Sequence, residues 1–102
     1  ITCVNYGGRR EILDAVNKML TAGETGPVTE ETLQKYLYLP DVPDPDLIIR
    51  TSGELRLSNF WLWQSAYSEY YFTDKYWPDF DKQDLLDAVG DYYERERRYG
   101  KA

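Results

Sequence analysis

The feature that most constrains this chain is an unbroken apolar run, Leu47–Ile49, which is followed at once by Arg50 and the turn-forming residues Thr51–Gly53. A short run without polar alternation is typical of a strand buried on both faces, as in a parallel sheet. Open α/β sheets bind ligands in the crevice beyond the carboxyl ends of their strands. Arg50 is therefore expected to face a ligand, and the glycine of the turn would let backbone N–H groups approach it closely.

The residue types near Arg50 suggest that this ligand is a phosphate. Arg50 and Arg56 are the only basic residues of the acidic segment 36–74, and Ser52 and Ser58 add hydroxyl groups. A guanidinium group presents a planar fork of donors that matches phosphate oxygens and stays charged at any working pH. On residue types alone the blander alternative stays open, in which the two arginines pair with Glu54 and a nearby aspartate at the surface.

Composition excludes several classes of function. The chain has 102 residues, enough for one small domain with a single core. Its net charge of -6 argues against a nucleic-acid-binding protein, which would normally present a basic face. It contains no histidine, which rules out histidine-based catalytic triads and histidine-ligated metals, and its lone Cys3 excludes an internal disulfide.

Helical and extended patterns alternate along the chain, which predicts an α/β fold with a mainly parallel sheet and crossover helices. Three strands are few for that architecture, and the first of them starts at residue 1, so we expect this chain to be part of a larger domain. The expected strands are residues 1–4, 47–49 and 69–72, and the expected helices are residues 9–22, a short one capped by Thr29, 58–67, and a last one capped by Asp81.

Two further patterns each allow two interpretations. Gly7-Gly8 lies between a predicted strand and a predicted helix, which is the skeleton of a phosphate-binding turn because helix N-termini present free N–H groups. Two glycines are a weak signal, and a simple tight turn is the favoured interpretation. Arg95, Arg97 and Arg98 close the last helix, where we expect a solvated, charged helix end.

Longer motifs then resemble one known family, the cis-prenyltransferases, and among them the bacterial enzymes that make undecaprenyl diphosphate. The similarity covers essentially the whole chain, in one order and at the family's spacing, which makes it far more specific than any single short pattern. The matching segments are Asn5–Arg9, Asp46–Glu54, Arg56–Phe60, Leu62–Glu69, Phe72–Asp74 and Trp77–Phe80.

The resemblance implies an enzyme that condenses isopentenyl diphosphate with an allylic diphosphate such as farnesyl diphosphate, using Mg²⁺. It also implies a homodimeric, cytoplasmic protein whose product passes to a membrane. By the family pattern Arg50, Arg56 and Ser58 bind the diphosphate of isopentenyl diphosphate, with the backbone at Leu57 in the same loop. Glu69 matches the family's carboxylate associated with magnesium, although by residue type alone it would be an ordinary polar residue on a strand.

The resemblance further implies that residues 1–102 are the C-terminal part of a single catalytic domain. The family's aspartate-containing motif for the allylic diphosphate lies upstream, so we expect no catalytic residue in this chain and no chain elongation by it alone. Two alternatives stay open. One is a non-catalytic subunit of a heteromeric cis-prenyltransferase, and the other is an aromatic-rich interaction module that uses Trp61, Trp63 and Trp77.

Overall fold

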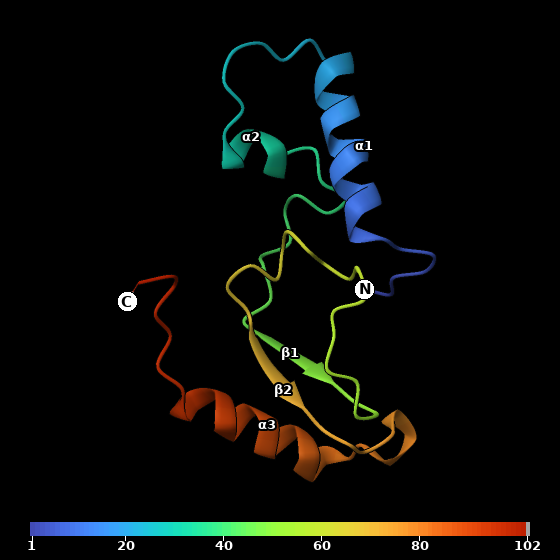
Figure 1. Ribbon diagram of the computed structural model, residues 1–102, viewed down its shortest axis with the longest axis vertical. Coiled ribbons are helices and arrows are strands. Elements are labelled where there is room, and N and C mark those ends of the chain that lie inside the picture. The colour runs from blue at the N-terminus through green and yellow to red at the C-terminus, as the bar shows by residue number, and fades with distance from the viewer. Residues whose placement is uncertain (102) are drawn as a thin grey trace. The chain divides into compact units, whose positions relative to one another are not determined.

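The computed structural model describes residues 1–101 and shows an α/β chain with a parallel pair of strands (Figure 1). This confirms the predicted fold class. The elements in order are α1 (Gly8–Thr21), α2 (Glu30–Gln34), β1 (Leu47–Arg50), β2 (Glu69–Phe72), a 3₁₀ turn at Trp77–Asp79, and α3 (Lys82–Glu94). None of the helices in the described residues is long and apolar enough to cross a membrane.

The described chain divides into two compact units. The helical unit comprises Ile1–Pro43 and Leu57–Trp63, and the sheet unit comprises Asp44–Arg56 and the chain from Gln64 onward. The chain thus passes from the sheet unit to the helical unit between Arg56 and Leu57, inside the segment that carries the predicted phosphate-binding residues.

The helical unit has a small apolar core between α1 and α2. Helix α1 begins and ends within one residue of the predicted bounds, and Gly23 takes a positive φ just after it. Helix α2 begins after Thr29 as predicted, because the Thr29 side chain accepts a hydrogen bond from the Thr32 N–H. Trp63 packs against this core and donates its indole N–H to Gln34 at 3.0 Å. The buried core residues are Ala15, Met19, Leu33 and Leu37.

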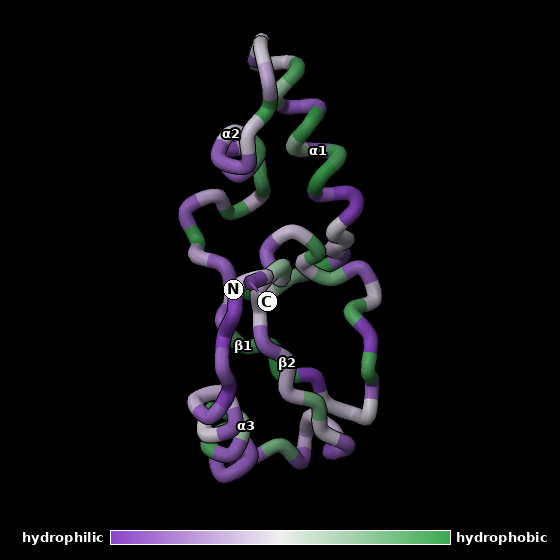
Figure 2. The backbone as a smooth tube through the Cα atoms, turned by 60° about the vertical axis from the view of Figure 1, so that its left-hand side comes forward, coloured by the Kyte–Doolittle hydropathy of each residue, from purple (hydrophilic) through white to green (hydrophobic). Residues whose placement is uncertain are grey.

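The sheet unit is built on the parallel pairing of β1 with β2, in a register that places Leu47 beside Glu69 and Arg50 beside Phe72. Helix α3 packs alongside both strands (Figure 1) and buries Ala88, and most of its length is hydrophilic (Figure 2). Asp81 caps this helix as predicted, and the structure adds a capping box, since the side chains of Asp81 and of the third helical residue, Asp84, each accept the backbone N–H of the other.

Two predicted elements are wrong. Ile1–Val4 forms no strand, because a strand is defined by its hydrogen-bonded partner and no segment of residues 1–101 pairs with it. The stretch 58–67 is a series of turns rather than a helix. Its backbone takes positive φ values of 52° at Ser58, 65° at Asn59 and 44° at Trp61, which a right-handed helix does not allow.

We predict that Gly8→Ala destabilises the protein even though alanine is the better helix former. A Cβ at Gly8 would lie 2.8 Å from Cγ of Leu62 and 3.0 Å from the Asn59 carbonyl oxygen, so the free energy of unfolding should fall by about 1–3 kcal/mol. Chemical denaturation of the natural protein that carries this chain measures this change in the free energy of unfolding.

Gly90→Ala is the matched control, because this glycine lies inside α3 and a Cβ there would meet nothing within 4 Å. This substitution should raise the free energy of unfolding by roughly 0.5–1 kcal/mol. Equal effects of the two substitutions would contradict the close packing at Gly8.

Candidate functional site

Arg50 ends β1 with its guanidinium group unengaged. Its backbone is fixed along the β2 side, because it pairs with Phe72 and its carbonyl oxygen accepts a hydrogen bond from the Thr73 N–H at 3.0 Å. The residue is half-buried, and among residues 1–101 no side chain or carbonyl group forms a hydrogen bond or ion pair with its guanidinium. A partly buried charge without a partner is unfavourable, so this position favours the binding of an anion.

The turn after β1 supports Arg50 in a way that the sequence did not indicate. Ser52 and Gly53 have φ values of 66° and 69°, as in a type I′ turn. Their N–H groups donate to the carbonyl oxygens of Lys75 and Thr73, at 2.7 and 3.0 Å. The expectation that the glycine lets backbone N–H groups approach a ligand is therefore wrong for Ser52 and Gly53, because both donors tie the turn to the chain after β2.

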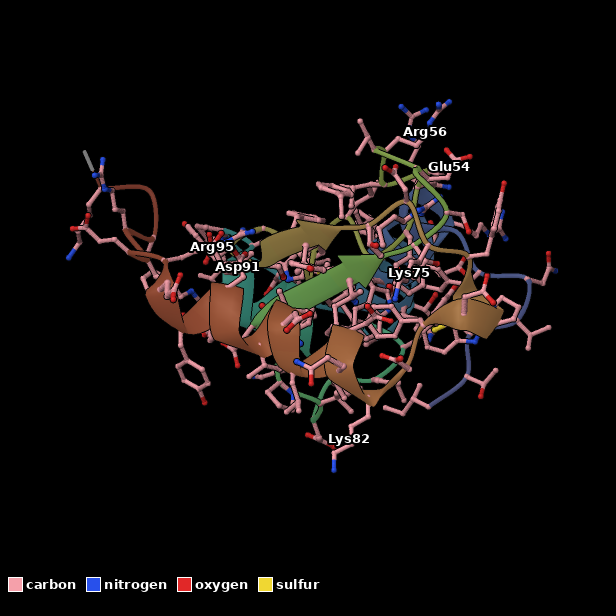
Figure 3. All side chains as sticks on the ribbon, turned by 90° about the horizontal axis from the view of Figure 1, so that it is seen from below. Glu54, Arg56, Lys75, Lys82, Asp91 and Arg95 are labelled. Carbon is pink, nitrogen blue, oxygen red and sulfur yellow. The ribbon has the colours of Figure 1, made fainter. Side chains whose placement is uncertain are left out.

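Arg56 lies in an exposed ion pair. Its Nε is 3.2 Å from Oε2 of Glu54, and its side chain is 75% exposed. The two side chains project together from the turn, away from α3 (Figure 3). The surface pairing expected from residue types thus applies to Arg56 but not to Arg50. Such a pair contributes little to stability, so an anionic ligand could displace Glu54 at small cost in energy.

Leu57 and Ser58 open a second tight turn, which belongs to the helical unit. The Phe60 N–H donates to the Leu57 carbonyl at 3.1 Å, across Ser58 and Asn59 with their positive φ values. Ser58 is exposed, and its hydroxyl makes no hydrogen bond within residues 1–101. A serine held in this conformation without a local partner is a candidate for a functional role.

The start of α1 is not an open anion site. The Gly8 N–H donates to the Asn59 carbonyl oxygen at 2.6 Å, and the Arg9 N–H donates to Oδ1 of Asn59 at 2.9 Å. The first two N–H groups of the helix are thus occupied, which supports the interpretation of Gly7-Gly8 as a tight turn. Tyr6 in this turn packs edge-on against Phe60, with ring centroids 5.5 Å apart.

The Tyr6 hydroxyl lies in a polar contact beneath this turn. It donates to Glu11, a buried carboxylate that also accepts the Tyr38 N–H at 2.9 Å. Burial, and next the hydrogen bond to Glu11, raise the pKa of Tyr6 well above its usual value. The phenol therefore stays protonated and acts as a fixed donor at the base of the turn.

Glu69 begins β2 and is held by an arginine that follows α3. Nη1 of Arg95 lies 3.3 Å from Oε2 of Glu69, while Nε and Nη2 of Arg95 bind Oδ2 of Asp91 at 2.9 and 2.6 Å. Asp91 and Arg95 lie side by side in Figure 3. The second oxygen of Glu69 has no hydrogen-bonding partner in the described residues and could reach a cation.

The sheet unit does not bring Arg50 and Glu69 together. Arg50 is the last residue of β1, whereas Glu69 is the first of β2 and pairs with Leu47. Three residues of strand separate the two positions by roughly 10 Å, and side-chain alternation directs them to opposite faces. Within residues 1–101 there is also no group of three or more His, Cys, Asp or Glu that could hold a metal ion.

The arginines after α3 are structural, which the sequence analysis missed. Arg97 donates to Oδ1 of Asp46 at 2.8 Å and to the Tyr67 carbonyl at 2.8 Å, and its guanidinium lies over the Tyr99 ring at 4.5 Å. With the Arg95–Glu69 pair, these contacts tie the chain after α3 to the residues that precede β1 and β2. The expected solvated helix end is thus wrong for Arg95 and Arg97. The tyrosines close to Arg97 in the sequence could have indicated these contacts, because an arginine side chain packs well on an aromatic ring.

The tryptophans proposed as interface residues differ in their environments. Trp63 packs on the core of the helical unit, and Trp61 stacks on Phe60 with centroids 5.1 Å apart. Trp77 is 70% exposed and stacks on Phe80.

Comparison with known proteins places this geometry in a family. The family model described as putative undecaprenyl diphosphate synthase matches residues 1–100. The chain belongs to this family. An isoprenyl transferase from Thermotoga maritima is 66% identical over 103 residues, covering 98% of this chain and 44% of that protein.

Solved structures of prenyl diphosphate synthases agree with the fold. The lavandulyl diphosphate synthase of Lavandula x intermedia, solved with dimethylallyl diphosphate, is 43% identical with a TM-score of 0.87 and is matched over 96% of this chain and 44% of its own. A probable undecaprenyl diphosphate synthase from Campylobacter jejuni is 36% identical with a TM-score of 0.85, matched over 96% and 45%. The chain thus spans less than half the length of these relatives in the undecaprenyl diphosphate synthase family.

We predict that Ser58→Gly stabilises this member of the family. Serine at a φ of 52° is strained, and glycine removes the strain, so the free energy of unfolding should rise by roughly 1 kcal/mol. Denaturant titration measures the change. Ala66→Gly, at an exposed residue without a positive φ, should lower stability instead. A loss of stability in both variants would show that Ser58 is not strained.

Proposed function

We propose that the natural protein carrying this chain is a cis-prenyltransferase, which adds isopentenyl diphosphate to an allylic diphosphate. In this proposal the chain supplies the part that binds isopentenyl diphosphate. The observation that carries the proposal is the unengaged guanidinium of Arg50 at the carboxyl end of β1. Family membership supports it, since the relatives bear the names of isoprenyl transferases and polyprenyl diphosphate synthases.

Each proposed binding residue has a distinct role. The guanidinium group of Arg50, at the fixed end of β1, donates two parallel hydrogen bonds to the diphosphate. Arg56 is exposed and exchanges its partner Glu54 for a phosphate oxygen. Ser58 adds its hydroxyl from the following turn, and the backbone at Leu57 belongs to the same loop.

The reaction requires the allylic diphosphate to leave while the double bond of isopentenyl diphosphate attacks the electron-poor carbon, after which a proton is lost. The residues of this chain contribute by binding and orienting the five-carbon substrate and by neutralising its charge. None of them is assigned to the proton transfer. The proposed enzyme is a homodimer, and its product is a long-chain polyprenyl diphosphate such as undecaprenyl diphosphate. Without the rest of the family domain, residues 1–102 are expected to show no prenyl-chain elongation.

Magnesium is the proposed cofactor, with Glu69 as its carboxylate. Mg²⁺ is usually bound by one or two carboxylates together with substrate phosphates and waters, so the single oxygen that Glu69 keeps unengaged fits this ion. When bound, the ion would neutralise charge on substrate phosphate oxygens near Glu69, at the end of the strand pair away from Arg50. Arg95 orients the carboxylate for this role by holding its other oxygen.

We predict that Arg50→Ala weakens binding of isopentenyl diphosphate by roughly 10- to 100-fold, as expected for loss of a charged hydrogen-bonding group. Arg56→Ala should have a smaller effect, because its side chain is more exposed and already paired. Isothermal titration calorimetry on the natural protein measures both dissociation constants.

Arg10→Ala is the matched control, since Arg10 is also an exposed arginine in an ion pair, with Asp14 on α1. The Arg10→Ala variant should bind isopentenyl diphosphate with the affinity of the wild type. An Arg50→Ala variant that binds isopentenyl diphosphate as tightly as the control would refute the assignment.

We also predict that Glu69→Gln raises the Mg²⁺ concentration needed for half-maximal activity, because a neutral amide is a poorer ligand for this ion than a carboxylate. Activity of the natural protein is followed across a Mg²⁺ titration. Glu31→Gln, at an exposed glutamate of α2, serves as the control and should leave the titration unchanged. Identical Mg²⁺ curves for the two variants would exclude Glu69 from the metal site.

A further inference from the structure

The turn that carries Ser58 is joined to the start of α1 at several points within the helical unit. The Asn59 carbonyl oxygen accepts the Gly8 N–H at 2.6 Å, and the Asn59 side-chain oxygen accepts the Arg9 N–H at 2.9 Å. A Cβ at Gly8 would clash with Leu62, so glycine is needed for this close approach.

These hydrogen bonds supply acceptors for the first N–H groups of α1 and donors for the two oxygens of Asn59. The first N–H groups of a helix have no acceptor inside the helix, and the cap residue normally supplies one. Here the cap position is Gly7, whose missing side chain supplies none. Asn59, distant in the sequence, takes over that role with two oxygens, and the positive end of the α1 dipole favours them.

The same contacts explain how the turn keeps its conformation. Ser58 and Asn59 both have positive φ values, which asparagine tolerates but serine adopts only at some cost in energy. The turn's own hydrogen bond, from the Phe60 N–H to the Leu57 carbonyl, is a single contact. The two bonds from Asn59 to α1 are the additional restraint on the strained Ser58.

We propose that Asn59 is a positioning residue for substrate, which holds the Ser58 hydroxyl in place by locking the Leu57–Phe60 turn onto the N-terminus of α1. This inference rests on the proposed function, in which Ser58 binds the diphosphate. Asn59 itself touches no substrate. Its side chain acts through the turn, so its removal should matter only where the Ser58 hydroxyl is present.

A double-mutant cycle in the natural protein tests this dependence. Asn59→Gly keeps the ease of a positive φ and the backbone bond to Gly8, and removes only the side-chain bond to the Arg9 N–H. We expect a KM for isopentenyl diphosphate and a calorimetric dissociation constant roughly 3- to 10-fold higher, with kcat unchanged at saturation and the melting temperature close to wild type.

The Ser58→Ala and double variants complete the cycle. Ser58→Ala should weaken binding by a similar factor, and the double variant should bind like Ser58→Ala alone. Asn5→Gly is the matched control: this asparagine also has a positive φ, of 51°, its side chain makes no hydrogen bond in residues 1–101, and the variant should keep the wild-type KM.

The outcomes separate the two claims. If Ser58→Ala weakens binding while Asn59→Gly does not, or if the two effects multiply in the double variant, Asn59 does not act through Ser58 and the inference is wrong. If Ser58→Ala itself leaves binding unchanged, the assignment of Ser58 to the diphosphate fails, and the positioning role of Asn59 fails with it. Should Asn59→Gly lower the melting temperature and kcat together, its role is structural and the inference is likewise overturned.

Discussion

The parallel pairing of β1 with β2 is the interaction on which the candidate site depends. Its register places Arg50 beside Phe72 and Glu69 beside Leu47, so the two strands present a guanidinium at one end and a carboxylate at the other. The turn after β1 extends this pairing, since Ser52 and Gly53 donate to the chain that follows β2. A strand end braced in this way can hold a charged side chain ready for a ligand, which reduces the entropy lost on binding.

The arginines show how context divides one residue type into two functions. Arg95 and Arg97 have their donors committed to carboxylates and a carbonyl group, and they fasten the chain after α3 to the strand region. Arg50 has no such partner among residues 1–101. An arginine surrounded by acceptors stabilises the fold, whereas an arginine on a rigid element without acceptors remains available to a diphosphate.

Sequence patterns predicted the elements whose determinants are local. Thr29 and Asp81 mark helix starts through their side chains, and the apolar run of β1 is distinct from its flanks. The sequence did not predict the turns at 58–67, because an aromatic run resembles a buried helix until the positive φ values of Ser58 and Asn59 are known. Those values depend on contacts with α1, about fifty residues away in the chain.

The candidate site was predictable only in part, because some of its features depend on local sequence and others on distant contacts. Arg50 is placed by the end of its own strand, which the apolar pattern shows directly. The separation of Arg50 from Glu69 depends on the register between two strands, and the pairing of Glu69 with Arg95 depends on how α3 packs. Neither relation is encoded locally, so motif similarity could name these residues without showing which of them lie together.

The most direct test of the central claim is a crystal structure of the natural protein with isopentenyl diphosphate bound. The account predicts that the Arg50 guanidinium lies about 3 Å from diphosphate oxygens at the carboxyl end of β1. A bound diphosphate that leaves Arg50 without contact, held instead by other groups, would contradict it.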